Sequence, residues 1–211
     1  MAYDLQEQEQ FDAIKAWWTD YGKLAVLAVI ACLVTIAAFQ GWRYYQAREG
    51  GRAATLYSQV DEADRAKEPK KVRDIAAQIV ERHGSTQYAG MAALAAAKAS
   101  FTTGEIEDAK KNLQWVIDHA KEDEMRDVAR LRLAGVLLDE RKHDEALRVL
   151  SAKAADAYAA LYADAKGDVL SAQGKPAEAR AAYQLALEKS DAGSPYRRLI
   201  ELKLDALGDA R

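Results

Sequence analysis

The feature that most limits how this chain can fold is an uncharged apolar run from Leu24 to Trp42. As a helix, its nineteen residues would span roughly 28 Å, close to the hydrocarbon thickness of a bilayer. Aromatic rings flank the run on both sides, as in the belt at a membrane interface: Trp17, Trp18 and Tyr21 before it, and Tyr44 and Tyr45 after it. The run therefore predicts one transmembrane helix over residues 24–42.

Two other interpretations of this run fit less well. A buried core helix rarely carries aromatic residues at both ends. A cleaved signal peptide begins with a basic region, whereas residues 1–23 hold five acidic side chains and two lysines, and no A-x-A cleavage site follows the run. We therefore expect an uncleaved anchor. Its orientation is not settled by charge, because Lys15 and Lys23 on one side face three arginines soon after the run on the other.

Composition predicts that the rest of the chain is helical. Alanine is abundant, whereas proline occurs three times and asparagine once, which disfavours strands and tight turns. A net charge of −3 gives no reason to expect nucleic-acid binding. The single cysteine, Cys32, excludes an intrachain disulfide.

Beyond the anchor, breaks in the helical pattern mark further elements. The pair Gly50 and Gly51 predicts an interruption of the helix, so residues 43–51 are expected to form a juxtamembrane linker. Nine helices are then expected, over 52–66, 70–83, 87–102, 105–120, 124–140, 143–151, 155–173, 176–190 and 195–207. The short connections between them favour antiparallel hairpins.

The last of these hairpins carries a pattern of small and large residues. Gly167 is followed by Gly174 after seven residues, Ala179 after twelve, Tyr183 after sixteen and Ala186 after nineteen. Small residues let the two helices of a hairpin approach closely, and the large residue fills the gap to the next hairpin. This is the pattern of a tetratricopeptide repeat.

The pattern recurs in two earlier hairpins. Ala109 and Ala146 correspond to Ala179, and the intervals of 37 and 33 residues lie close to the roughly 34 of this repeat. Residues 52–83 form a fourth expected hairpin without clear anchors. The sequence thus predicts an all-α protein in which one N-terminal transmembrane helix precedes a right-handed tetratricopeptide-like α-solenoid over 52–211, the alternative being a generic helical bundle.

Several segments together resemble a known family over nearly the whole chain. The segments are FDAIKAWWTDYGK (11–23), GWRYYQ (41–46), AATLYSQV (53–60), QYAGMAALAAAKA (87–99), VARLRLAGVLLDERKHDEAL (128–147) and DAKGDVLSAQGKPAEARAAYQLAL (164–187). With the acidic leader and the anchor, they resemble the YfgM family, the tetratricopeptide-containing ancillary subunit of the bacterial SecYEG translocon.

The resemblance carries expectations about location and partners. It implies the inner membrane, with a short cytoplasmic segment over 1–23, the span over 24–42 and a periplasmic repeat domain over 52–211. It also implies association with the SecYEG translocon and with the membrane-anchored periplasmic chaperone PpiD, and it gives no catalytic residues or cofactor to carry over. Unfolded client segments are a further class of partner.

The repeat pattern also predicts a binding surface. The first helix of each hairpin lines the concave face of such a stack, and counting from the small anchor positions gives its lining: Met91, Leu94, Lys98, Phe101, Val128, Leu131, Leu138 and Leu161, followed by Asp164 and Asp168. This mostly apolar face suits extended or helical peptide segments. Alternatively, the last helix, with Leu199, Leu202 and Leu204, covers its C-terminal half.

A second expected interface lies in the membrane. Ala25, Ala28, Cys32 and Thr35 are spaced by 3, 4 and 3 residues, so they share one face of the helix. Small residues allow close approach of helices in lipid, although the abundance of alanine could produce the same face by composition alone.

The sequence shows no catalytic constellation. His83, His119 and His143 lie far apart, and no phosphate-binding or nucleophile motif occurs. We therefore expect no enzyme activity, no cofactor and no metal site. The remaining alternative to a translocon subunit is an anchored structural adaptor of envelope assembly or cell division that does not contact translocating chains.

Overall fold

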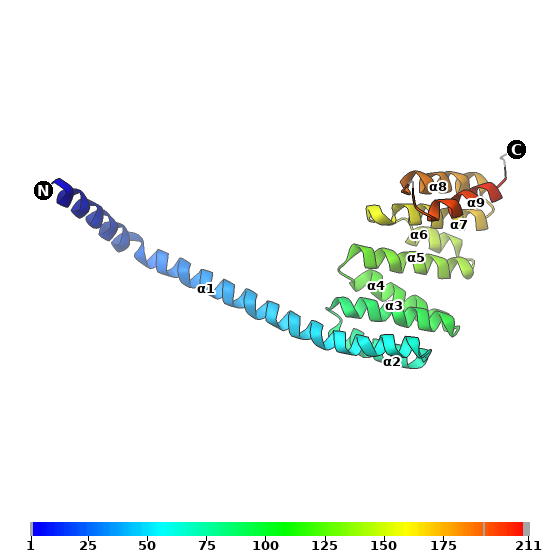
Figure 1. Ribbon diagram of the computed structural model, residues 1–211, viewed down its shortest axis with the longest axis horizontal. Coiled ribbons are helices and arrows are strands. Elements are labelled where there is room, and N and C mark those ends of the chain that lie inside the picture. The colour runs from blue at the N-terminus through cyan, green and yellow to red at the C-terminus, as the bar shows by residue number, and fades with distance from the viewer. Residues whose placement is uncertain (1, 192, 209–211) are drawn as a thin grey trace. The chain divides into compact units, whose positions relative to one another are not determined.

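The computed structural model describes residues 2–191 and 193–208, apart from the side chains of residues 2–14 and of Ala25. Within those ranges every regular element is a helix (Figure 1). The elements are α1 (Ala2–Arg65), α2 (Pro69–His83), α3 (Gln87–Thr102), α4 (Ile106–His119), α5 (Asp123–Asp139), α6 (His143–Val149), the 3₁₀ helix η1 (Asp156–Tyr158), α7 (Ala159–Ala172), α8 (Pro176–Lys189) and α9 (Tyr196–Ala206). The prediction of an all-α chain is confirmed.

Tertiary contacts divide the chain into two units, Met1–Glu49 and Gly50–Arg211. In the first unit, α1 carries exposed apolar side chains such as Leu27, Ile30 and Val34. Among the described residues, it is the one helix long and apolar enough to cross a membrane. Aromatic rings pair at either end of the apolar stretch, as a membrane interface favours. A single long, apolar helix near the N-terminus is therefore confirmed within the described residues, and its length and composition fit a membrane anchor.

The paired glycines do not interrupt α1. Gly50 and Gly51 are both helical, so the expected break within residues 43–51 is wrong, and residues 52–65 are the end of α1. Glycine weakens a helix by about 1 kcal/mol relative to alanine but fits its backbone without a clash. A Cβ at either position would meet no atom within 4 Å, so these glycines are not required by packing. The other predicted helices lie within a few residues of the observed ones.

In the second unit, neighbouring helices pack as antiparallel hairpins in chain order (Figure 1). The end of α1 packs with α2 and α3 around Val60 and Ile79. A middle core contains side chains from each of the helices α3 through α7. A third cluster contains side chains of α7, α8 and α9 around Ile200. Each hairpin therefore buries its apolar face mainly against the next one, as in a repeat protein.

The repeat anchors lie where the pattern places them. Ala109, Ala146 and Ala179 are all completely buried. Gly167 is buried as well, and a Cβ on it would overlap Cε1 of the Tyr183 ring. The small and large positions of the last hairpin are therefore in direct contact.

Four equivalent turns close the hairpins. In each turn one residue has a left-handed backbone: Lys67 (φ 56°), Gly104 (φ 80°), Arg141 (φ 59°) and Gly174 (φ 72°). The amide of the residue that follows donates to the carbonyl oxygen five residues back, at 2.8–3.0 Å in all four cases. This is the hydrogen-bond pattern of a Schellman motif. The shared turn identifies the end of α1 and α2 as a fourth repeat.

Candidate protein-binding groove

Two cavities lie between the first helices of successive hairpins. The first, of about 320 Å³, lies between α3, α4 and α5 and is lined by the predicted residues Lys98 and Phe101. The second, of about 300 Å³, lies between α5, α7 and α9, and the predicted residues that line it are Leu131, Leu138, Leu161, Asp164 and Asp168. Gly135 lines both cavities, so the two together form one groove.

Three of the predicted lining residues lie outside these cavities. Met91, Leu94 and Val128 are half-buried and line neither cavity. Leu94 packs against the middle core. The predicted residues that do line the cavities therefore lie in the C-terminal halves of α3 and α5, and along α7.

The last helix occupies part of the predicted face. Lys203 on α9 donates to both carboxylate oxygens of Asp164, at 2.9 and 2.8 Å, and to Asp168 at 2.8 Å. The Tyr196 hydroxyl also donates to Asp164, at 2.8 Å. Asp164 is almost completely buried, with 2% exposure. These two carboxylates are therefore bound within the chain.

The titration of these groups reflects that packing. Burial alone would lower the pKa of Lys203, but its hydrogen bonds to Asp164 and Asp168 outweigh burial and raise the pKa above its ordinary value. Burial and a hydrogen bond to Asp164 raise the pKa of Tyr196. Burial and the hydrogen bond that it donates to Asp168 likewise raise the pKa of Tyr183. Lys203 therefore stays charged, and both tyrosines stay neutral, at neutral pH.

The apolar side chains of α9 divide between its two faces. Ile200 is completely buried, and Leu204 packs against the same cluster. Leu199 and Leu202, which were predicted to lie on the helix that covers the groove, are exposed by 45% and 50%. The helix therefore packs against α7 and α8 with one face, and its other face is exposed to solvent.

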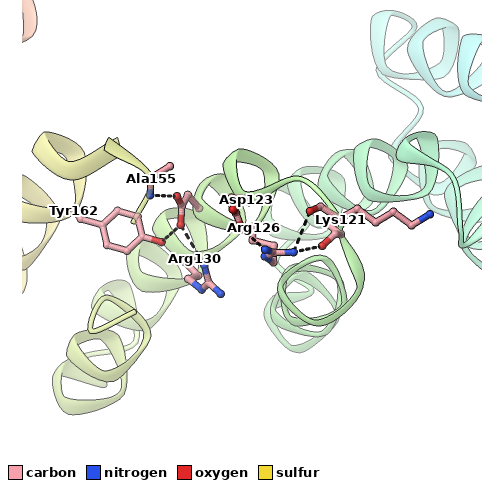
Figure 2. Close-up of polar contacts among 8 residues, drawn as sticks. Lys121, Asp123, Arg126, Arg130, Ala155 and Tyr162 are labelled. Carbon is pink, nitrogen blue, oxygen red and sulfur yellow. Dashed lines mark hydrogen bonds and ion pairs between the residues drawn. The ribbon is translucent and has the colours of Figure 1, made fainter. Parts of the chain in front are cut away.

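A buried carboxylate that no sequence pattern indicated connects α5 to α7. Asp127, with 1% exposure, accepts hydrogen bonds from the Tyr162 hydroxyl at 2.7 Å and the Ala155 amide at 2.8 Å. Arg130 donates to the same side chain at 3.1 Å (Figure 2). Burial and the bond to Asp127 raise the pKa of Tyr162. The network joins the two helices that flank the second cavity.

An arginine closes the neighbouring connection. Arg126 donates to the carbonyl oxygen of Ala120 at 2.6 Å and to that of Lys121 at 3.3 Å, and it pairs with Asp123 (Figure 2). It thereby satisfies carbonyls just beyond the C-terminal end of α4. Arg126 therefore holds the connection between α4 and α5, and the adjacent Asp127 holds the chain that leads into α7.

The predicted membrane face is only partly described. Ala28, Cys32 and Thr35 are exposed on α1, whereas the side chain of Ala25 lies outside the described residues. The Thr35 hydroxyl donates to the Ala31 carbonyl oxygen at 2.8 Å. Its polar group is therefore satisfied within the helix, and the face remains a prediction.

The histidines do not come together. His83 and His119 end α2 and α4, and His143 begins α6. The His119 ring stacks on Trp115 at 4.7 Å between centroids. Within the described part of the chain, no three His, Cys, Asp or Glu side chains are grouped so that they could hold a metal ion.

Comparison with known proteins gives the same fold. A family model described as a tetratricopeptide repeat-like domain matches residues 15–209. The solved structure described as "MamA RS-1 ArsTM double mutant" superposes with a TM-score of 0.55 at 16% identity, covering 75% of this chain and 95% of that one. At this identity the likeness concerns the fold alone.

Curated relatives match almost end to end. An "Ancillary SecYEG translocon subunit" of Neisseria gonorrhoeae (strain ATCC 700825 / FA 1090) is 32% identical, over 98% of this chain and all of the relative. The protein of that name in Escherichia coli (strain K12) is 27% identical, over 95% of this chain and 96% of its own. The protein therefore belongs to the YfgM family of ancillary SecYEG translocon subunits, with a tetratricopeptide repeat-like domain.

Proposed function

We propose that this protein is a non-enzymatic interaction subunit of the Sec export machinery, anchored in the inner membrane by residues 24–42. Residues 1–23 lie in the cytoplasm and the repeat domain lies in the periplasm. The end-to-end match to relatives named ancillary SecYEG translocon subunits carries this proposal. The apolar N-terminal helix supports it, because one such helix supplies the membrane attachment that a translocon subunit needs.

Reporter fusions test the orientation. Alkaline phosphatase, which folds to its active form only in the periplasm, should be active when it is fused after the last residue. A reporter that works only in the cytoplasm should be inactive at the same site. The opposite result for the pair would place the repeat domain in the cytoplasm.

The proposed partners are the SecYEG translocon and a PpiD-like membrane-anchored chaperone, with unfolded client segments as further ligands. The test is purification of the intact protein from gently solubilised membranes, with crosslinking before lysis. Recovery of the translocon channel would support the proposal. Recovery of envelope-assembly or division proteins without the channel would favour the adaptor role instead.

The groove is the proposed site of these contacts. Phe101 is 42% exposed beside the first cavity, and Leu131 lines the second. A few large apolar anchors usually dominate such interfaces, so changing both residues to Asp should reduce partner recovery at least about tenfold. Leu185→Asp is the matched control, because Leu185 is 45% exposed on α8 and lines neither cavity. Unchanged recovery with helix content preserved would exclude the groove.

A further inference from the structure

Gly135 is a glycine that the chain's own packing does not explain. It lies inside α5, where glycine is a poorer helix former than alanine. Its backbone is not left-handed, unlike that of Gly104 and Gly174. A Cβ on Gly135 would meet no atom within 4 Å, whereas a Cβ on Gly167 would clash with a tyrosine ring. No contact within the described part of the chain therefore requires glycine at this position.

The position of Gly135 in the groove suggests why a residue without a side chain occurs there. It is exposed and lines both cavities of the groove, at the point where they meet. Packed helices lie 8–10 Å apart, depending on the side chains between them. A glycine here lets the backbone of a bound segment reach the near end of that range, with apolar side chains directed into the two cavities.

Two unpaired charges flank the glycine on the same helix. Arg132 and Asp139 are exposed at the rim of the first cavity. They are seven residues apart, which corresponds to about 10.5 Å along α5. Among the described residues neither has a hydrogen-bond or ion-pair partner, whereas Lys98 beside them is bound to Asp64 at 2.8 Å. A complementary ligand therefore carries an acidic group opposite Arg132 and a basic group opposite Asp139.

The adjacent part of the groove already holds a helix. By the repeat register, Gly135 follows Ala134 as Asp168 follows Gly167, so Gly135 and Asp168 are equivalent positions. Asp168 is contacted by Lys203 of α9. Tyr196 of α9 also lines the second cavity. A helix bound over Gly135 would thus continue the surface that α9 already covers.

From these observations we infer that the groove binds a helix of a partner protein, which lies along α5 in contact with Gly135. The bound helix has an acidic and a basic side chain two turns apart, with small and apolar residues between them. This inference rests on the proposed groove function and specifies the form of the ligand. The charges set orientation and specificity more than affinity, because both are exposed.

Filling the glycine position separates this role from a structural one. Gly135→Leu should strengthen α5 and raise the Tm of the full-length protein by about 2–4 °C, while translocon recovery falls at least about tenfold. Ala181→Leu, at an exposed position on α8, is the control and should leave recovery unchanged. If Phe101→Asp with Leu131→Asp abolishes recovery but Gly135→Leu does not, the groove function stands and the helix inference is wrong. If Gly135→Leu lowers the Tm, the glycine is structural and the inference is also wrong.

Crosslink spacing tests whether the ligand is a helix. Photoreactive benzoylphenylalanine is placed at position 132 in one full-length protein and at 139 in another, and the adducts are mapped by mass spectrometry. A bound helix gives adducts about seven residues apart on one partner, whereas an extended segment gives about three. Adducts about three residues apart, adducts on unrelated segments, or no adduct would each overturn the inference. Charge reversal at Arg132 should lower recovery about fivefold, and reversal at Lys111, outside the groove, should not.

Discussion

Tyr183 lies directly against Gly167, and its hydroxyl donates to the next residue, Asp168, at 2.8 Å. The ring therefore cannot turn away from the glycine without losing a hydrogen bond. The contact brings α7 and α8 close together, and α7 carries the two carboxylates that hold α9. A single close approach inside one hairpin thus fixes the C-terminal end of the groove.

Gly167→Ala should destabilise the protein by about 1–3 kcal/mol, because the new methyl group overlaps the Tyr183 ring. Thermal unfolding of the purified full-length protein measures the loss. Gly90→Ala is the comparison, since a Cβ there would meet the flexible Met125 side chain instead. It should cost less, and an equal loss from both variants would contradict the role given to the ring.

The turns offer a stabilising change. Lys67 and Arg141 take the left-handed conformation that Gly104 and Gly174 adopt in the equivalent turns. A residue with a Cβ is strained there by roughly 1 kcal/mol, so Lys67→Gly and Arg141→Gly should each raise the free energy of unfolding by up to about 1 kcal/mol. The gain is partly offset by the greater freedom of glycine in the unfolded chain. Gly104→Ala and Gly174→Ala should have the opposite effect, and a loss of stability in the first pair would refute the argument.

The same turns show why the first repeat was hard to predict. Aligned on the turn residues, Val60 and Val72 take the positions that Ala97 and Ala109 occupy in the next hairpin, and all four are buried. The repeat pattern is defined by small residues at the helix contacts and a glycine in the turn. The first hairpin has valines at the helix contacts and Lys67 in the turn. The first hairpin therefore has the same turn geometry as the later hairpins but lacks the small residues and the glycine by which they are recognised. Helix positions in the later hairpins were predictable because Gly104, Gly174 and the buried alanines carry the signal.

The binding surface was predictable only in part. The repeat register placed Phe101 and Leu131 beside the cavities, because position along a first helix decides which face a residue occupies. It could not show that Lys203 binds Asp164, since their pairing depends on how α9 folds back onto α7. The role of Asp127 was equally hidden, because a buried carboxylate and an exposed one look alike in a sequence.

Removing the Asp127 carboxylate should be among the most damaging single changes in the repeat domain. Asp127→Ala leaves the Tyr162 hydroxyl and the Ala155 amide without their acceptor and should cost about 3 kcal/mol. Tyr162→Phe removes one hydrogen bond and should cost about 1 kcal/mol. Urea unfolding of both variants and of the double variant gives the coupling energy. The double variant should lose little more than Asp127→Ala, and simple additivity would show that the two side chains act independently.

The proposed membrane face can be tested by adding bulk. Replacing Ala28 and Cys32 with Leu keeps the helix able to insert but fills the small face, so translocon recovery should fall several-fold. The same replacement at Ile30 and Ala37, on the opposite side of the helix, should be tolerated. Recovery is measured by co-purification from gently solubilised membranes. An equal effect of both pairs would remove the case for a specific face.

The hydrogen bonds that α8 and α9 make to Asp164 and Asp168 of α7 predict a loss of stability in alkali. The pKa values of Lys203, Tyr196 and Tyr183 are raised by folding above their ordinary 10.5 and 10.0, so the folded state holds their protons more tightly than the unfolded state does. Their stabilisation is therefore complete below about pH 10 and is lost as pH rises through the higher folded values. The free energy of unfolding should fall by up to about 1.4 kcal/mol per pH unit for each group.

Lys203→Met combined with Tyr196→Phe should flatten this dependence between about pH 10 and 12. Tyr162 and Tyr183, whose pKa values are also raised, still contribute to the slope in that variant. Denaturant unfolding at stepped pH values measures the slope, with Tyr88→Phe as a control that leaves α7 and α9 intact. The double variant should also be less stable at neutral pH, because Asp164 is left buried without its partners. A double variant with the wild-type slope would show that these contacts do not hold α9 in place.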